Sequence, residues 1–147
     1  MSNHIVGSSG FKQCQRNEIQ ALIRTFEMPA FFITINPSDI CNLLIGLLGD
    51  IQVHEWQVMT SFKHGAFVAC HPVLAAMFFH KIMAHFLDIV VHADSESPGL
   101  FEWCEAYYGM VEAQGRGTLH CHLLLWLSGN PNPQLLYDQI QSSLEYR

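Results

Sequence analysis

Two histidines in one short run, His120 and His122, are the side chains of this sequence best suited to metal chemistry. They lie in the stretch from Gly117 to Leu127, where a glycine precedes β-branched and apolar residues, a pattern that predicts a β-strand. Side chains alternate along a strand, so both imidazoles leave the same face while Cys121 points the other way as an inert core residue. Two neutral imidazoles on a rigid strand can bind a divalent cation and leave its other positions open. The alternative is a pair of half-buried core histidines.

A second predicted strand, Ala106 to Gln114, precedes the first, and Gly115-Arg116-Gly117 supplies the glycines of a three-residue hairpin loop. With that loop length, Glu112 lies directly across from His120, with Cβ atoms about 5 Å apart. Glu112 is therefore the predicted third ligand, and Gln114 on the same face is a fourth ligand or a group that orients an imidazole. The alternative is that Glu112 is only a solvated cross-strand partner. Polar groups clustered between apolar neighbours cost stability unless something satisfies them, which favours the metal interpretation.

The stretch from Tyr107 to His122 resembles the His-hydrophobe-His segment of the amino-terminal, helicase-like region of Helitron transposases, the proteins of rolling-circle transposons. Three further stretches resemble the same domain, so that the resemblance covers nearly the whole chain: Met1 to Gly7, Pro29 to Asp39, and Pro72 to Asp88. The resemblance implies an HUH-like, replication-initiator-like endonuclease with an antiparallel sheet and flanking helices. It also implies Mg²⁺ or Mn²⁺ polarising a scissile phosphate, and a tyrosine attacking that phosphate in single-stranded DNA.

Residue by residue, Glu112, His120 and His122 match the metal positions of that family. Arg116 at the hairpin tip is the basic residue nearest the predicted metal, and we expect it to contact a phosphate. The family's nucleophilic tyrosines form a pair one helical turn apart on a helix well downstream of the histidine strand.

Only Tyr137 and Tyr146 follow His122 here, and a spacing of nine residues puts them on opposite sides of a helix. They are the candidate nucleophiles of this chain, but a tyrosine among apolar helix residues is more often a packing residue. We therefore expect half of an active site and an incomplete domain, with the rest of a transposase and its helicase as a partner.

Length and composition fit one domain, residues 1–147. The chain is 50% hydrophobic and 12% aromatic, which supplies a core and argues against disorder. Five cysteines without C-x-x-C spacing argue against a disulfide framework and a zinc knuckle, and favour a reducing intracellular compartment; the resemblance implies the nucleus. We expect no membrane partner, because no signal peptide is apparent and polar residues interrupt the most apolar stretch, Val73 to Val91.

The charge of the chain disfavours tight DNA binding. Thirteen acidic and seven basic residues give a net charge of −6, whereas affinity for a phosphate backbone comes from Lys and Arg that displace counterions. Five of the basic residues are scattered singly along the sequence: Lys12, Arg16, Arg24, Lys63 and Lys81. The chain alone is therefore expected to bind single-stranded DNA weakly.

The spacing of apolar residues and the positions of Gly, Pro and other turn residues predict the remaining elements. The pattern predicts a helix over Gln15 to Phe26, a strand over Ala30 to Asn36 and a short helix through Leu47. Residues His54 to Phe67 fit neither a helix nor a strand well. The longest predicted helix runs from Pro72 to about Val91, and another follows Pro133. The predicted fold is α+β, an antiparallel sheet flanked by helices.

The long predicted helix carries a second set of possible metal ligands. Lys81, His85, Asp88 and His92 recur at spacings of four, three and four, so the last three could bind a metal. We interpret this stripe instead as the solvated face of an amphipathic helix, with the buried face formed by Val73, Met77, Phe78, Ile82, Phe86 and Ile89. Asp39, after the first strand, is expected to cap the following helix rather than reach the metal.

Two versions of the function stay open. In the first, the chain is the metal-binding part of a nicking and joining endonuclease. In the second, it is a non-catalytic folded remnant of a transposon protein with a structural or weak binding role. The missing tyrosine pair favours the second version for this chain alone.

Overall fold

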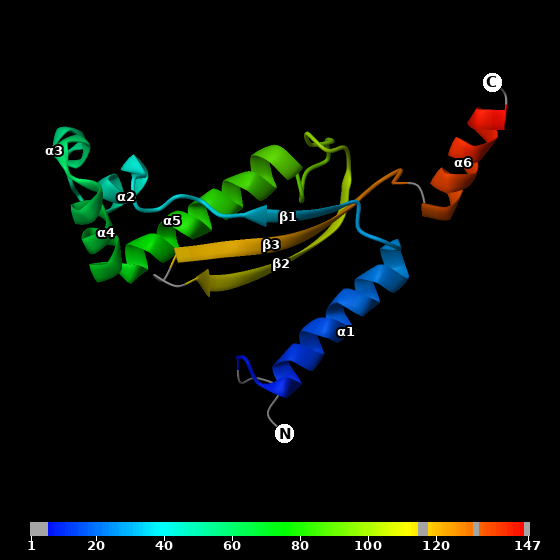
Figure 1. Ribbon diagram of the computed structural model, residues 1–147, viewed down its shortest axis with the longest axis horizontal. Coiled ribbons are helices and arrows are strands. Elements are labelled where there is room, and N and C mark those ends of the chain that lie inside the picture. Colours follow the sequence, from blue (N-terminus) through cyan, green and yellow to red (C-terminus); the bar gives the residue numbers. More distant parts are fainter. Residues whose placement is uncertain (1–5, 115–117, 131–132, 146–147) are drawn as a thin grey trace.

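The computed structural model describes residues 6–114, 118–130 and 133–145. Its elements, in chain order, are α1 (Ser9–Phe26), β1 (Phe31–Ile35), α2 (Leu43–Leu48), α3 (Val53–Val58), α4 (Ser61–Cys70), α5 (Pro72–His85), the π-helical turn η1 (Phe86–Val91), β2 (Cys104–Gln114), β3 (Thr118–Leu127) and α6 (Pro133–Glu145). The fold is α+β, as the sequence predicts (Figure 1).

The sheet has three antiparallel strands in the order β1-β3-β2, so the histidine strand β3 lies in the centre. Its bounds agree with the predicted run of β-branched and apolar residues. In the β2–β3 hairpin Glu112 pairs with His120 and Gln114 pairs with Thr118, which confirms the predicted register. A slip of one residue would have turned Glu112 to the opposite face.

The two faces of the sheet have different surroundings. On one face, Cys121 and Leu123 of β3 pack with Phe79 of α5 in a core that includes Ile33 and Ile35 of β1. Cys121 is 1% exposed, as expected for a core residue, and burial raises the pKa of its thiol. On the other face α1 contacts β2: Gln15 donates a hydrogen bond from Nε2 to the sulfur of Met110 at 3.6 Å. The two histidines belong to this second face.

A second core lies among the short helices α2 to α4 and the start of α5. Its buried members are Ile45, Trp56, Val68, Ala75 and Phe78. Helix α5 runs along the sheet into this helical group (Figure 1), and its neighbouring residues Phe78 and Phe79 enter different cores. One helix therefore ties the sheet to the helical group.

By length and composition alone, Pro72–Val91 would be long and apolar enough to cross a membrane, although its polar residues led us to expect no spanning segment there. One such helix is a weak indication, because helices of a protein core can have the same composition. In this fold 22% of its most apolar window is buried, and its buried phenylalanines join the two cores.

Several predicted element bounds need correction. Helix α1 begins six residues earlier than Gln15, because the Ser8 hydroxyl caps it by accepting from the Phe11 amide. The ambiguous stretch His54 to Phe67 belongs to two helices, α3 and α4. Asp39 does not cap α2: the Asn42 side chain does, accepting from the Leu44 amide.

The predicted buried face of the long helix is partly wrong. Val73, Met77 and Ile89 are 69%, 45% and 61% exposed, whereas Ala75 and Phe79 are buried. The buried surface is rotated and widened, because α5 packs on two separate cores rather than on one. A single amphipathic stripe could not have indicated this arrangement.

Candidate metal centre

Glu112, His120 and His122 meet at the hairpin end of the sheet. Each offers a ligand atom, and these atoms all lie within 4.8 Å of one another. The separation between His120 Nε2 and Glu112 Oε2 is 3.5 Å. That is long for a hydrogen bond, but it suits two ligands that each lie about 2.1 Å from one shared ion.

His120 is the buried member of this cluster. The residue is 5% exposed, and its Nδ1 has no hydrogen-bond partner among the described residues. The ring nitrogen that faces Glu112 is the other one, Nε2, so this is the His120 atom that would bind an ion, while Nδ1 would keep its surroundings. The Glu112 side chain is 50% exposed and is free to turn, which lets the ligand set contract around an ion.

Thr34 of β1 holds the second histidine. It pairs with His122 across the sheet, and its Oγ1 lies 3.0 Å from His122 Nδ1. When that nitrogen donates its proton to the hydroxyl, the other ring nitrogen, Nε2, presents its lone pair to an ion. Phe32 stacks on the same imidazole, with ring centroids 5.5 Å apart and planes 10° from parallel. Two β1 residues thus fix the His122 ring.

Sequence reasoning missed Thr34 and Phe32. Both lie in the predicted strand Ala30 to Asn36, and strand alternation puts them on one face. The missing information was that this strand pairs with β3 in a register that sets Thr34 beside His122. That contact links residues 88 positions apart in the chain, which a local pattern does not encode.

Replacing Thr34 by valine is expected to weaken binding of a divalent ion about 10- to 100-fold, the usual effect of removing a partner that orients a metal-binding histidine. Valine keeps the shape and β-propensity of threonine, so the sheet should persist. Calorimetric titration with Mn²⁺ measures the affinity, and circular dichroism checks the fold. A variant that binds Mn²⁺ like the parent would show that the Thr34 hydroxyl does not orient the ligand.

Other predicted site residues are not brought to this cluster or lie outside the described part of the chain. Gln114 ends β2 in the predicted register, and no placement of its side chain is described. Arg116 and Tyr146 fall outside the described residues. Tyr137 is 58% exposed on α6, which lies beyond the end of the sheet opposite the hairpin (Figure 1).

The rival stripe on the long helix does not form a ligand set. Within the described residues, Glu112, His120 and His122 are the group found to have metal-ligand spacing. A π-helical turn from Phe86 to Val91 breaks the regular spacing of the stripe, and His92 has a positive φ of 54°. Its Nδ1 faces the hydroxyl of Ser97 at 3.1 Å, whereas the His85 Nδ1 contacts the Lys81 carbonyl oxygen.

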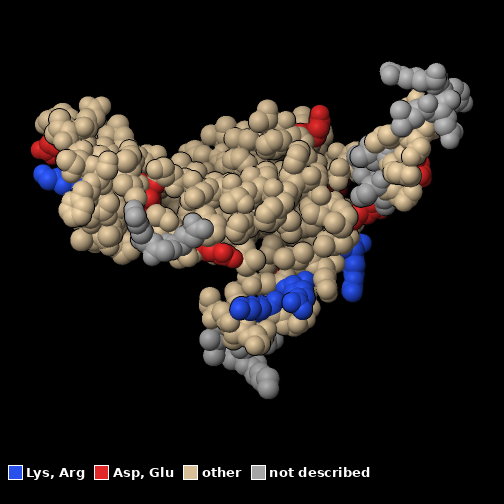
Figure 2. All heavy atoms as spheres, in the orientation of Figure 1, with Lys and Arg blue, Asp and Glu red and all other residues tan. Residues whose placement is uncertain are grey.

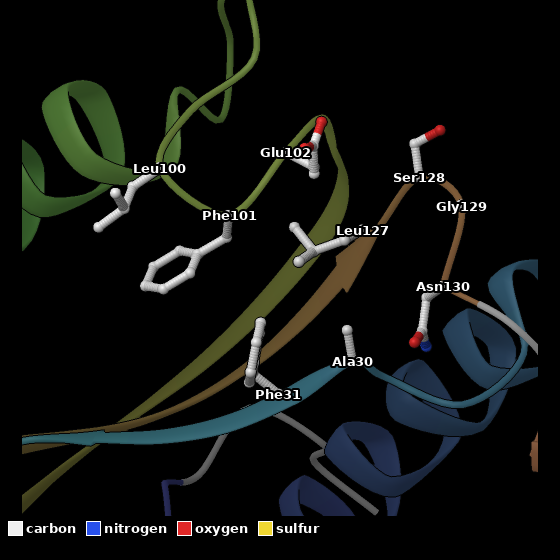
Figure 3. Close-up of a pocket in the computed structure, with 9 residues that line it drawn as sticks. All are labelled: Ala30, Phe31, Leu100, Phe101, Glu102, Leu127, Ser128, Gly129 and Asn130. Carbon is white, nitrogen blue, oxygen red and sulfur yellow. The ribbon is translucent and has the colours of Figure 1, made fainter.

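A hollow of about 470 Å³ lies at the other end of the sheet, between the start of β1 and the end of β3. Phe31 and Phe101 meet across it with ring centroids 5.4 Å apart, and the Glu102 carboxylate points outward (Figure 3). It holds one carboxylate and no histidine, so it lacks the ligand set of the hairpin end.

The fold and this cluster define an α+β domain with a candidate metal centre of two histidines and one glutamate on an antiparallel hairpin. Residues 1–125 match the family described as the Helitron helicase-like domain at the N-terminus, and the chain belongs to this family. Neither a curated protein nor a solved structure matches the chain significantly. The role of the chain is therefore related to transposons.

Proposed function

We propose that this chain is the metal-binding part of a rolling-circle transposon endonuclease that nicks and joins single-stranded DNA. Glu112, His120 and His122 would hold Mn²⁺ or Mg²⁺, and the bound ion would withdraw charge from the scissile phosphate. The observation that carries the proposal is the cluster of three ligand atoms on the hairpin of a Helitron-family domain. A nuclear location, single-stranded DNA and the remainder of a transposase and helicase as partners belong to this proposal.

The chain's own residues supply the geometry. The central strand β3 is paired on both sides, so the two histidine backbones are held rigidly. Thr34 and Phe32 fix the ring of His122 from β1, while Glu112 approaches from β2. Each strand of the sheet thus contributes a residue to the site. An ion with three protein ligands has further coordination positions, and a phosphate oxygen could occupy one of them.

The second version, a non-catalytic remnant, is favoured by one observation. No tyrosine of the described residues contacts the cluster: Tyr107 lines a hollow on the α5 side of the sheet, and Tyr108 is bound to Glu18. In that version the fold and the metal site persist without DNA chemistry.

Iron-directed cleavage separates the two versions. With Fe²⁺ in place of Mn²⁺, ascorbate and peroxide generate hydroxyl radicals at the site, and we expect cuts confined to a few nucleotides of a bound single-stranded oligonucleotide. The cuts should disappear in His122→Ala, and His85→Ala serves as a matched control that keeps them. Uniform cutting, or cutting that survives His122→Ala, would show that DNA does not lie at this ion and would favour the remnant.

A further inference from the structure

Helix α1 gathers basic residues that are separated in the sequence. Lys12, Arg16 and Arg24 all lie on α1, and they are three of the seven basic residues of the chain. Figure 2 shows Lys and Arg spheres on α1 below the sheet; elsewhere on this face acidic groups are scattered, and further basic spheres lie among the short helices at the left. Three positive charges that stand singly in the sequence thus share one helix.

A groove of about 420 Å³ lies between α1 and β2, and Lys12 and Arg16 line it together with Met110 and Glu112. The two cations are four residues apart, so they lie one above the other on the same side of the helix. In the ranges that the structure describes, neither is paired with a carboxylate. The groove therefore joins two free positive charges to Glu112, the carboxylate of the candidate metal centre.

Phe32 lies on the opposite side of the metal cluster. It is 66% exposed on the edge strand β1, although a phenyl ring normally favours burial. Its ring is held parallel to His122, so its orientation is set while much of its surface remains open. An exposed, oriented aromatic ring is the usual element on which an unpaired base stacks.

We infer that single-stranded DNA crosses the sheet from β1 to α1, with one base stacked on Phe32 and the following backbone phosphates bound by Lys12 and Arg16. The inference rests on the proposed function, because the metal cluster lies between these two contacts. Phe32 and Glu112 lie on strands two ladder spacings apart, about 10 Å, and their partners on β3, Leu124 and His120, are four residues apart, about 13 Å. The resulting separation of about 16 Å is one that a short run of nucleotides spans. Lys12, Arg16 and Phe32 are positioning residues for the strand.

Fluorescence anisotropy with a labelled twelve-nucleotide oligothymidylate in EDTA tests this path without any metal. The double variant Lys12→Gln and Arg16→Gln is expected to lose roughly 10- to 100-fold in affinity at 50 mM salt and to lower the salt slope by about 1.4, which corresponds to two phosphate contacts. Phe32→Leu is expected to lose about fivefold or more while keeping the salt slope, since stacking releases no counterions.

Matched variants control for net charge and for exposed aromatic surface. Lys63→Gln with Lys81→Gln removes the same charge from α4 and α5, and Phe62→Leu removes a ring that is 85% exposed on α4. Both should bind the oligonucleotide like the parent. A duplex of the same length should lose affinity in the Lys12 and Arg16 variant but not in Phe32→Leu, because its bases are already stacked.

Equal losses in the test and control variants, or no binding of the single strand by the parent, would overturn the inference. Mn²⁺ titration of the same variants keeps this result separate from the proposed function. If the Lys12 and Arg16 variant binds Mn²⁺ normally and loses DNA, the path is supported. If the parent binds no Mn²⁺ but the variant still loses DNA, the metal role fails while the strand path stands.

Discussion

Replacing either histidine of the metal centre, His120→Ala or His122→Ala, is expected to weaken Mn²⁺ binding by more than roughly a hundredfold, beyond the effect of removing an orienting partner. Three side chains offer ligand atoms to the ion here, and each variant leaves only two of them. The parent should bind Mn²⁺ more tightly than Mg²⁺, because imidazoles suit Mn²⁺ better and Mg²⁺ gives up its water reluctantly. Calorimetric titration measures both affinities.

His85→Ala is the matched control, because it removes a histidine of the rival stripe on α5. It should leave Mn²⁺ binding unchanged. Since His120 is buried, thermal unfolding of each variant must show that the fold persists, and the half-buried His122 provides the milder test. Normal Mn²⁺ binding in both His120→Ala and His122→Ala would place the ion elsewhere and contradict the proposed centre.

The sequence predicted the hairpin because its determinants are local. A three-residue loop with glycines and the alternation of two adjoining strands set Glu112 opposite His120, and the structure has that register. The bounds of β3 follow from the same run of β-branched and apolar residues. The positions of the three strands, the pairing of two of them and the three candidate ligands could therefore be predicted without tertiary information.

Contacts between distant segments were not predictable in this way. Thr34 reaches His122 only because β1 adds to the free edge of β3, and Lys12 reaches the Glu112 side only because α1 folds back on β2. The buried face of α5 was misjudged for the same reason, since two cores share that helix. Local sequence patterns predict the helices and strands, whereas tertiary packing between distant segments determines which of their side chains meet at the site.

Incubating this chain with single-stranded oligonucleotides and Mn²⁺ is expected to give no covalent protein–DNA adduct. A nucleophilic phenol oxygen must lie in line with the phosphate, and such positioning supplies roughly 7 to 11 kcal/mol of a barrier. Tyr107 lies on the α5 side of the sheet, and Tyr137 lies on α6 beyond the end opposite the hairpin (Figure 1). Neither side chain meets that requirement. Gel electrophoresis under denaturing conditions detects an adduct.

Tyr108 shares the histidine face but is held in an unreactive state. Its hydroxyl donates to Glu18 at 2.9 Å, and burial together with that carboxylate raises the pKa of Tyr108 to about 12. This phenol therefore stays protonated near neutral pH, and its hydrogen bond joins α1 to β2 instead of leaving the oxygen available to attack a phosphate. Tyr108→Phe should therefore not change the result. An adduct that requires His120 and disappears in Tyr137→Phe or Tyr146→Phe would contradict the expected absence, because it would mean that a tyrosine reaches the metal centre.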